Sequence, residues 1–136
     1  MRENKRKHLE FIQGVVNRLS TNSFLLKGWS VALVSALFVL SSKDARPAFL
    51  FLTYIPAIIF WGLDGYCLWQ ERLFRALYQQ VRTIPEDQID FCMSTKKVEG
   101  EDRPTWLYAT FSKTLIVFHG ALIISIVVVM FLGLSR

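Results

Sequence analysis

Two ionisable residues, Asp64 and His119, stand inside stretches of sequence that are otherwise strongly apolar. A carboxylate and an imidazole can share a hydrogen bond or a proton, and inside a membrane each is costly unless it is paired or wetted. Measured from the polar end of its apolar stretch, each residue lies roughly 8 Å inside by helical rise. Because the two stretches run antiparallel, both side chains fall at a similar depth, where an Asp64–His119 hydrogen bond would lower the cost of burying them.

Three interpretations of Asp64 are open at this point. The carboxylate can bond within a helix bundle and fix its packing, which is the interpretation we favour. It can instead serve a proton- or ion-linked activity, or reach the lipid headgroups from an interfacial position. The first apolar stretch adds Ser30, Ser35 and Lys27 as polar candidates, and the long stem of Lys27 suits an ammonium that extends to the headgroups.

The remaining reactive residues form no recognised catalytic or metal-binding pattern. His8 and His119 are not at metal-ligand spacing, and Cys67 and Cys92 are too few to indicate a disulfide framework. Gly-rich phosphate loops and hydrolase motifs are absent from the sequence. Ser112 and His119 are two helical turns apart, about 10 Å, which is too far for a nucleophile and its base. We therefore expect no enzyme activity, no metal and no cofactor.

The elements that position these residues are apolar helices. Hydrophobic residues make up 52% of the 136 residues and are pooled into three blocks. The last block, from Thr114 to Leu134, is uncharged and spans about 31 Å as a helix, close to the thickness of a bilayer core. The sequence predicts a single all-α membrane domain over residues 1–136, with a kink at Pro56 in the second span. The predicted transmembrane helices cover residues 24–41, 47–69 and 113–134.

The first predicted span has an alternative interpretation. Its most apolar part, Trp29 to Leu40, is short enough for the apolar region of a signal peptide behind a basic segment. We favour a retained helix, because the residues before it have their own helical pattern and no convincing cleavage site follows it.

Two further helical segments flank the spans. Residues 1–22 carry apolar side chains at helical spacing between basic ones, which predicts an amphipathic helix on the inner membrane surface or against a neighbouring subunit. The polar residues at 20–23 are expected to cap the end of this helix and the start of the next. The second span is expected to continue as a polar helical extension over residues 70–83, with Glu71 and Arg75 forming an ion pair.

Residues 84–112 are predicted to be a loop. The part from Glu86 to Asp102 is acidic and is interrupted by a short apolar strip. This strip, with Ile89, Phe91 and Met93, is a candidate docking site for a protein partner. The alternative, which we favour, is that the loop tucks the strip against its own helix bundle.

Positive charge orients the chain. Thirteen of the 16 Lys and Arg residues fall before the first span, between the second and third, or, as Lys27 and Lys113, in the first turns of the first and third spans. By the positive-inside rule, the N-terminus is cytoplasmic and the C-terminus is periplasmic. We attribute the net charge of +5 to this topology, and we do not expect nucleic acid as a partner.

Small residues mark places where helices can approach closely. Ala32 and Ala36 are four residues apart in the first span, and Gly62 and Gly65 lie beside Asp64. Such residues allow close packing in membranes, where burial of apolar surface does not drive association. A bundle of three spans hides few polar groups, so we expect the chain to form a homo-oligomer.

Several stretches of the chain resemble a known group of small bacterial inner-membrane proteins. They include residues 8–13, 22–29, 61–66, 70–72, 90–93 and 111–114. The chain is similar over nearly its whole length to the RipA family, described as octameric membrane proteins. The resemblance implies a ring-shaped homo-oligomer, an octamer, without known catalytic chemistry. It also implies that Lys27, Trp29, Asp64 and Glu71 matter for assembly.

Three functions are compatible with these observations. The first is a non-enzymatic homo-oligomeric scaffold or sensor of the bacterial inner membrane, with a role in stress or host adaptation. The second is an oligomeric ion channel or membrane-permeabilising effector, for example in phage defence, which would need Asp64, His119, Ser30 and Ser35 to line a wetted path. The third is an accessory subunit that docks a cytoplasmic partner through residues 86–102.

Overall fold

The computed structural model describes residues 3–44, 47–98 and 103–134. Three of its helices are long and apolar enough to cross a membrane, which confirms the all-α class and fits a multi-pass membrane protein. Two short 3-10 turns, η1 and η2, cover Glu86–Gln88 and Thr95–Lys97. The α-helices are α1 (Glu3–Asp44), α2 (Pro47–Leu52), α3 (Tyr54–Thr83), α4 (Trp106–Thr110) and α5 (Lys113–Leu134).

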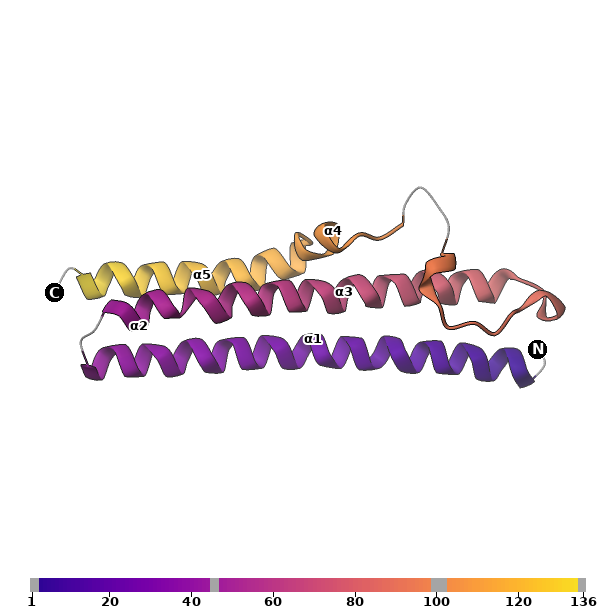
Figure 1. The fold of residues 1–136 in the computed structure, drawn as a ribbon, viewed down its shortest axis with the longest axis horizontal. Helices are drawn as coiled ribbons and strands as arrows, with labels where there is room; N and C mark the ends of the chain where they lie inside the picture. Colours follow the sequence, from indigo (N-terminus) through magenta and orange to yellow (C-terminus); the bar gives the residue numbers. More distant parts are fainter. Residues whose placement is uncertain (1–2, 45–46, 99–102, 135–136) are drawn as a thin grey trace.

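The long helices are arranged side by side, with α3 between α1 and α5 (Figure 1). α1 runs along the whole of α2 and α3, whereas α5 covers α2 and only the first part of α3. We call residues 24–44, 47–69 and 113–134 the membrane half, and residues 3–23 and 70–98 the polar half. α4 lies at the junction of the two halves.

The helix α1 is continuous, so the predicted break at residues 20–23 is wrong. Its buried and half-buried positions together recur every three or four residues, and this register passes through residues 20–23 without interruption. The first half of α1 therefore packs along α3 of its own chain. The buried residues of α1 include Leu9, Ile12, Val16, Ser30, Val34 and Ser41.

The polar side chains expected to cap a helix end are used differently. Ser20 donates a hydrogen bond to Glu71 of α3, with 3.4 Å between the oxygens. Thr21 donates to the backbone carbonyl of Asn17 one turn earlier, at 3.0 Å. A side chain that bonds across the bundle or back to its own helix leaves the backbone ladder intact, so the helix continues.

The polar half has a small core between α1, α3 and the following loop. Leu9, Ile12, Leu77, Val81 and Val98 are buried together there. The ammonium of Lys5 donates to the carbonyl oxygens of residues 82 and 84, at 3.0 and 2.7 Å. These carbonyls would otherwise lack partners at the end of α3, so the start of α1 is tied to the end of α3. The predicted helical extension over residues 70–83 is confirmed.

The second span is interrupted near Pro56, where a kink was predicted. α2 ends at Leu52 and α3 begins at Tyr54, with Thr53 in helical dihedral angles between them. Pro56 has no N–H group, so the carbonyl of Leu52 cannot receive its usual bond from the residue four positions later. The helix is locally loosened there and then resumes, since Ala57 donates to the carbonyl of Thr53 at 3.3 Å.

The short helix α4 was not predicted, because residues 84–112 were expected to be a loop. Two indoles of α3 hold it: Trp61 donates to the carbonyl of Thr110 at 2.9 Å, and Trp69 to that of Pro104 at 2.8 Å. In return, Trp106 donates to the carbonyl of Gly62 at 3.2 Å. A Cβ at Gly65 would lie 2.1 Å from the hydroxyl oxygen of Thr110, so α4 can approach α3 this closely only because residue 65 is glycine.

Gly65→Ala should therefore push α4 away from α3 and destabilise the protein by about 1–3 kcal/mol, the usual cost of overpacking. The measurement is the free energy of unfolding in mixed micelles. Gly120→Ala is the matched control, because nothing lies within 4 Å of a Cβ at that position in α5. Equal stability of the Gly65→Ala variant and the wild type would contradict the close α3–α4 packing.

Candidate functional site

The carboxylate of Asp64 connects all three membrane helices. From α5, Nε2 of His119 lies 2.9 Å from Oδ2 of Asp64, and both side chains are fully buried at 0% exposure. From α1, Nζ of Lys27 lies 2.6 Å from the same oxygen, and the hydroxyl of Ser23 donates to Oδ1. The Asp64–His119 hydrogen bond that the sequence made possible is present, and both carboxylate oxygens accept hydrogen bonds.

The position of Lys27 corrects an expectation. Its side chain turns inward to Asp64 and is 22% exposed, rather than extending to the headgroups. Its ammonium also donates to the hydroxyl of Ser23, at 2.8 Å. An ammonium at this depth is costly unless a counter-charge is close, and Asp64 provides that charge.

The geometry assigns the proton on His119. A carboxylate only accepts hydrogen bonds, so Nε2 of His119 carries the hydrogen. The buried Nδ1 atom has no partner among the described residues, so a second proton there would be an unsatisfied donor. The neutral imidazole therefore fits the site, and the charges of Lys27 and Asp64 cancel. We call Ser23, Lys27, Asp64 and His119 the polar cluster.

Aromatic rings surround the imidazole. Trp61 stacks on His119, with ring centroids 5.8 Å apart and 8° between the planes. Phe118 meets the same ring edge-on at 5.0 Å, and the Lys27 ammonium lies 5.9 Å from the centroid of Phe118. This lining excludes water and holds the imidazole in one orientation. Trp61 was not among the predicted site residues, although its position three residues before Asp64 places both on one face of a helix.

The two serine candidates have different positions. Ser30 is fully buried one turn after Lys27 in α1, and its hydroxyl has no hydrogen-bond partner among the described residues. Ser35 is exposed on the outer face of α1, as are Ala32 and Ala36. Ser30 therefore lies beside the polar cluster, and Ser35 does not.

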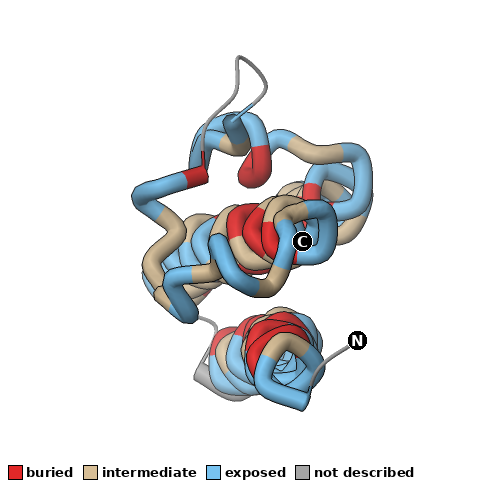
Figure 2. The backbone as a smooth tube through the Cα atoms, turned by 90° about the vertical axis from the view of Figure 1, so that its right-hand side faces the viewer, coloured by how far each residue is buried: buried red, intermediate tan, exposed pale blue. Residues whose placement is uncertain are grey.

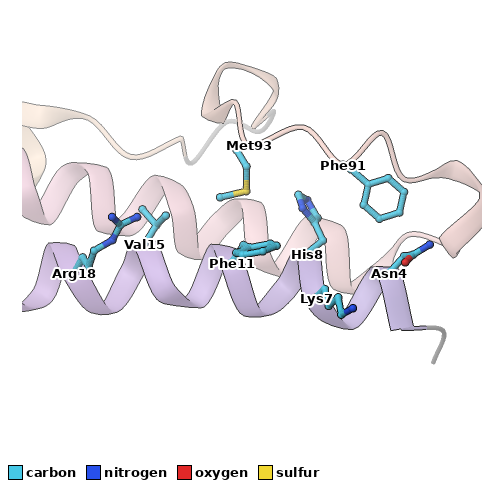
Figure 3. Close-up of a pocket in the computed structure, with 8 residues that line it drawn as sticks. All are labelled: Asn4, Lys7, His8, Phe11, Val15, Arg18, Phe91 and Met93. Carbon is cyan, nitrogen blue, oxygen red and sulfur yellow. The ribbon is translucent and has the colours of Figure 1, made fainter.

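A second feature is a groove of about 550 Å³ on the polar half (Figure 3). Its most exposed aromatic ring is that of Phe11, which is 68% exposed although it lies outside the membrane half. Phe91 meets His8 edge-on there, at 5.5 Å between centroids, and adopts a positive φ of 51° that is rare for a large side chain. The groove is lined by Asn4, Lys7, His8, Phe11, Val15, Arg18, Phe91 and Met93.

The three residues of the predicted docking strip do not share one surface. Ile89 and Met93 pack on the core of the polar half, as the favoured alternative expected, whereas Phe91 remains 43% exposed at the groove. Lys97 forms an ion pair with Asp90, which keeps the pKa of this carboxyl below its ordinary value. At neutral pH the pair is therefore charged, and it joins two exposed positions of the loop.

The described residues offer little other chemistry. Within residues 3–44, 47–98 and 103–134, no three His, Cys, Asp or Glu side chains gather to hold a metal ion. Cys67 and Cys92 are both free thiols. Comparisons of the chain with protein-family models, curated proteins and solved structures found no match.

A double-mutant cycle tests the polar cluster. Lys27→Met should lower the free energy of unfolding in mixed micelles by about 2 kcal/mol, because it leaves a buried carboxylate without its counter-charge and the lysine itself is partly exposed. In the Lys27→Met background, Asp64→Leu should cost less than it does alone, since the unpaired charge is gone.

The control for this cycle is Ser35→Ala, which changes an exposed residue of the same helix and should stay within about 0.5 kcal/mol of the wild type. If the costs of Lys27→Met and Asp64→Leu simply add, the two side chains do not interact.

Proposed function

We propose that this protein is a non-enzymatic membrane scaffold that assembles with further copies of itself through the outer face of α1. The observation that carries the proposal is the exposure of Phe11 in the polar half, where a large aromatic ring meets water. Burying such a ring is worth about 1.5–3 kcal/mol, so a partner surface is favoured there.

The exposed face of α1 extends from the groove into the membrane half. Trp29, five turns after Phe11, is 61% exposed, and Ala32 and Ala36 follow at the spacing of one turn. α1 stands at the edge of the row of helices (Figures 1 and 2), and in the polar half this face is bordered by the loop residues Phe91 and Met93 of the groove. Small residues in the membrane and an aromatic groove outside it support one continuous contact between two chains.

A contact between two different faces of the same chain closes into a ring when the rotation allows it. In the proposed ring, the exposed face of α1 in one copy contacts a different face of the next copy. The resemblance to the RipA family supports an octamer. Lys27, Asp64 and Glu71, which the resemblance links to assembly, bond within one chain here. Their proposed role in assembly is indirect, since they hold α1 straight against α3.

The channel alternative receives less support from the geometry. Asp64, His119 and Ser30 are buried between helices of a single chain, whereas Ser35 faces outward. These four residues do not share one path through the bundle. A scaffold or sensor needs no such path, and a second, cytoplasmic partner could contact the groove through Phe91.

We place the scaffold in the inner membrane of a bacterium, with the polar half in the cytoplasm and a role in stress or host adaptation. The distribution of Lys and Arg supports this orientation, since the polar half and its flanking residues carry most of the positive charge.

Assembly is tested by placing a charge in the groove. Phe11→Asp should shift the complex released from lipid nanodiscs to fewer subunits in native mass spectrometry, because the carboxylate would be desolvated in the contact. Gln13→Asp is the matched control, since it places the same charge on the same helix outside the groove. A wild-type monomer, or equal masses for both variants, would contradict the proposal.

The orientation is tested with a reporter enzyme that is active only in the cytoplasm. Fused after residue 136, it should be inactive, and fused before residue 1 it should be active. The reverse pattern would contradict an N-terminus in the cytoplasm.

A further inference from the structure

A cavity of about 570 Å³ with two arginines in its lining lies where α4 meets α3. The indole of Trp69 fixes one wall by donating to the carbonyl of Pro104 at 2.8 Å. Cζ of Arg72 lies over the ring of Tyr108, 5.6 Å from its centroid, which orients the guanidinium. The lining residues are Arg72, Arg103, Pro104, Thr105 and Tyr108.

In the parts of the chain that the structure describes, neither Arg72 nor Arg103 forms an ion pair. Glu71, the acid next to Arg72 in sequence, is engaged by Arg75, whose nitrogens lie 2.8 and 2.9 Å from Oε1. Two positive charges at one cavity favour an external anion.

The ends of the second and third predicted spans place the cavity at the depth expected for lipid headgroups. Arg72 follows Trp69 at the end of the second span, and α4 directly precedes the third span. Aromatic and apolar side chains exposed at this position are typical of a membrane interface. The exposed side chains of this kind on and beside α4 are Trp106, Leu107, Tyr108 and Phe111.

We propose that this cavity binds a phosphate group, supplied by the headgroup of an anionic phospholipid in the leaflet on the α4 side. Guanidinium groups match phosphate oxygens with paired hydrogen bonds, and the hydroxyl of Thr105 can donate a further one. The acyl chains would continue along the exposed apolar face of α4. The site is formed within a single chain and does not depend on the proposed assembly.

The test uses the full chain in nanodiscs of phosphatidylcholine with increasing phosphatidylglycerol. The thermal midpoint of the wild type should rise with the anionic lipid, because a ligand that binds the folded state stabilises it. Arg72→Gln with Arg103→Gln should weaken the apparent affinity by about tenfold per guanidinium removed. Arg103→Gln alone changes an exposed residue and should give a partial loss in a folded protein.

Arg82→Gln with Lys96→Gln is the matched control, since it removes the same charge from exposed positions of the polar half. This control should respond to phosphatidylglycerol as the wild type does. A second arm adds inorganic phosphate to nanodiscs of phosphatidylcholine alone. Stabilisation in that arm, lost in the double arginine variant, would support the phosphate site and assign it to a soluble ligand. Equal responses of the double arginine variant and its control would overturn the proposal.

Discussion

The structure depends on one constraint, which is that the carboxylate of Asp64 is buried in an apolar bundle and must be satisfied there. Removing an ion from water costs several kcal/mol, and this cost is offset only when charge and hydrogen bonds are supplied in good geometry. Lys27 supplies the charge from α1, and His119 supplies a hydrogen bond from α5. Because these partners come from different helices, satisfying one side chain fixes the relative positions of all three spans.

This constraint also explains why α1 is long and straight. Lys27 must reach Asp64 at the same time as Leu9 and Ile12 pack on the end of α3, so the buried face of α1 keeps one register through both halves. The opposite face is then exposed along its length, from Phe11 to Ala36. Internal packing on one side of α1 thus creates the surface that we propose for assembly on the other.

The sequence predicted the three spans and the Asp64–His119 pair, because apolar length and the cost of buried charge are properties of local sequence. It did not predict that α1 is continuous, since Ser20 and Ser23 are typical capping residues and their partners on α3 are distant in sequence. The helix α4 was missed for a similar reason. Five residues carry a weak local signal, and the contact with Gly65 is visible only in three dimensions.

The most direct test of this account is the ¹⁵N NMR spectrum of the His119 imidazole in lipid bilayers, recorded with His8→Gln so that one histidine remains. We expect a neutral ring protonated at Nε2, with a hydrogen-bonded ¹⁵N shift that moves when Asp64→Leu is introduced. A ring protonated at Nδ1, or a spectrum unchanged by Asp64→Leu, would contradict the claim that Asp64 joins the helices through His119.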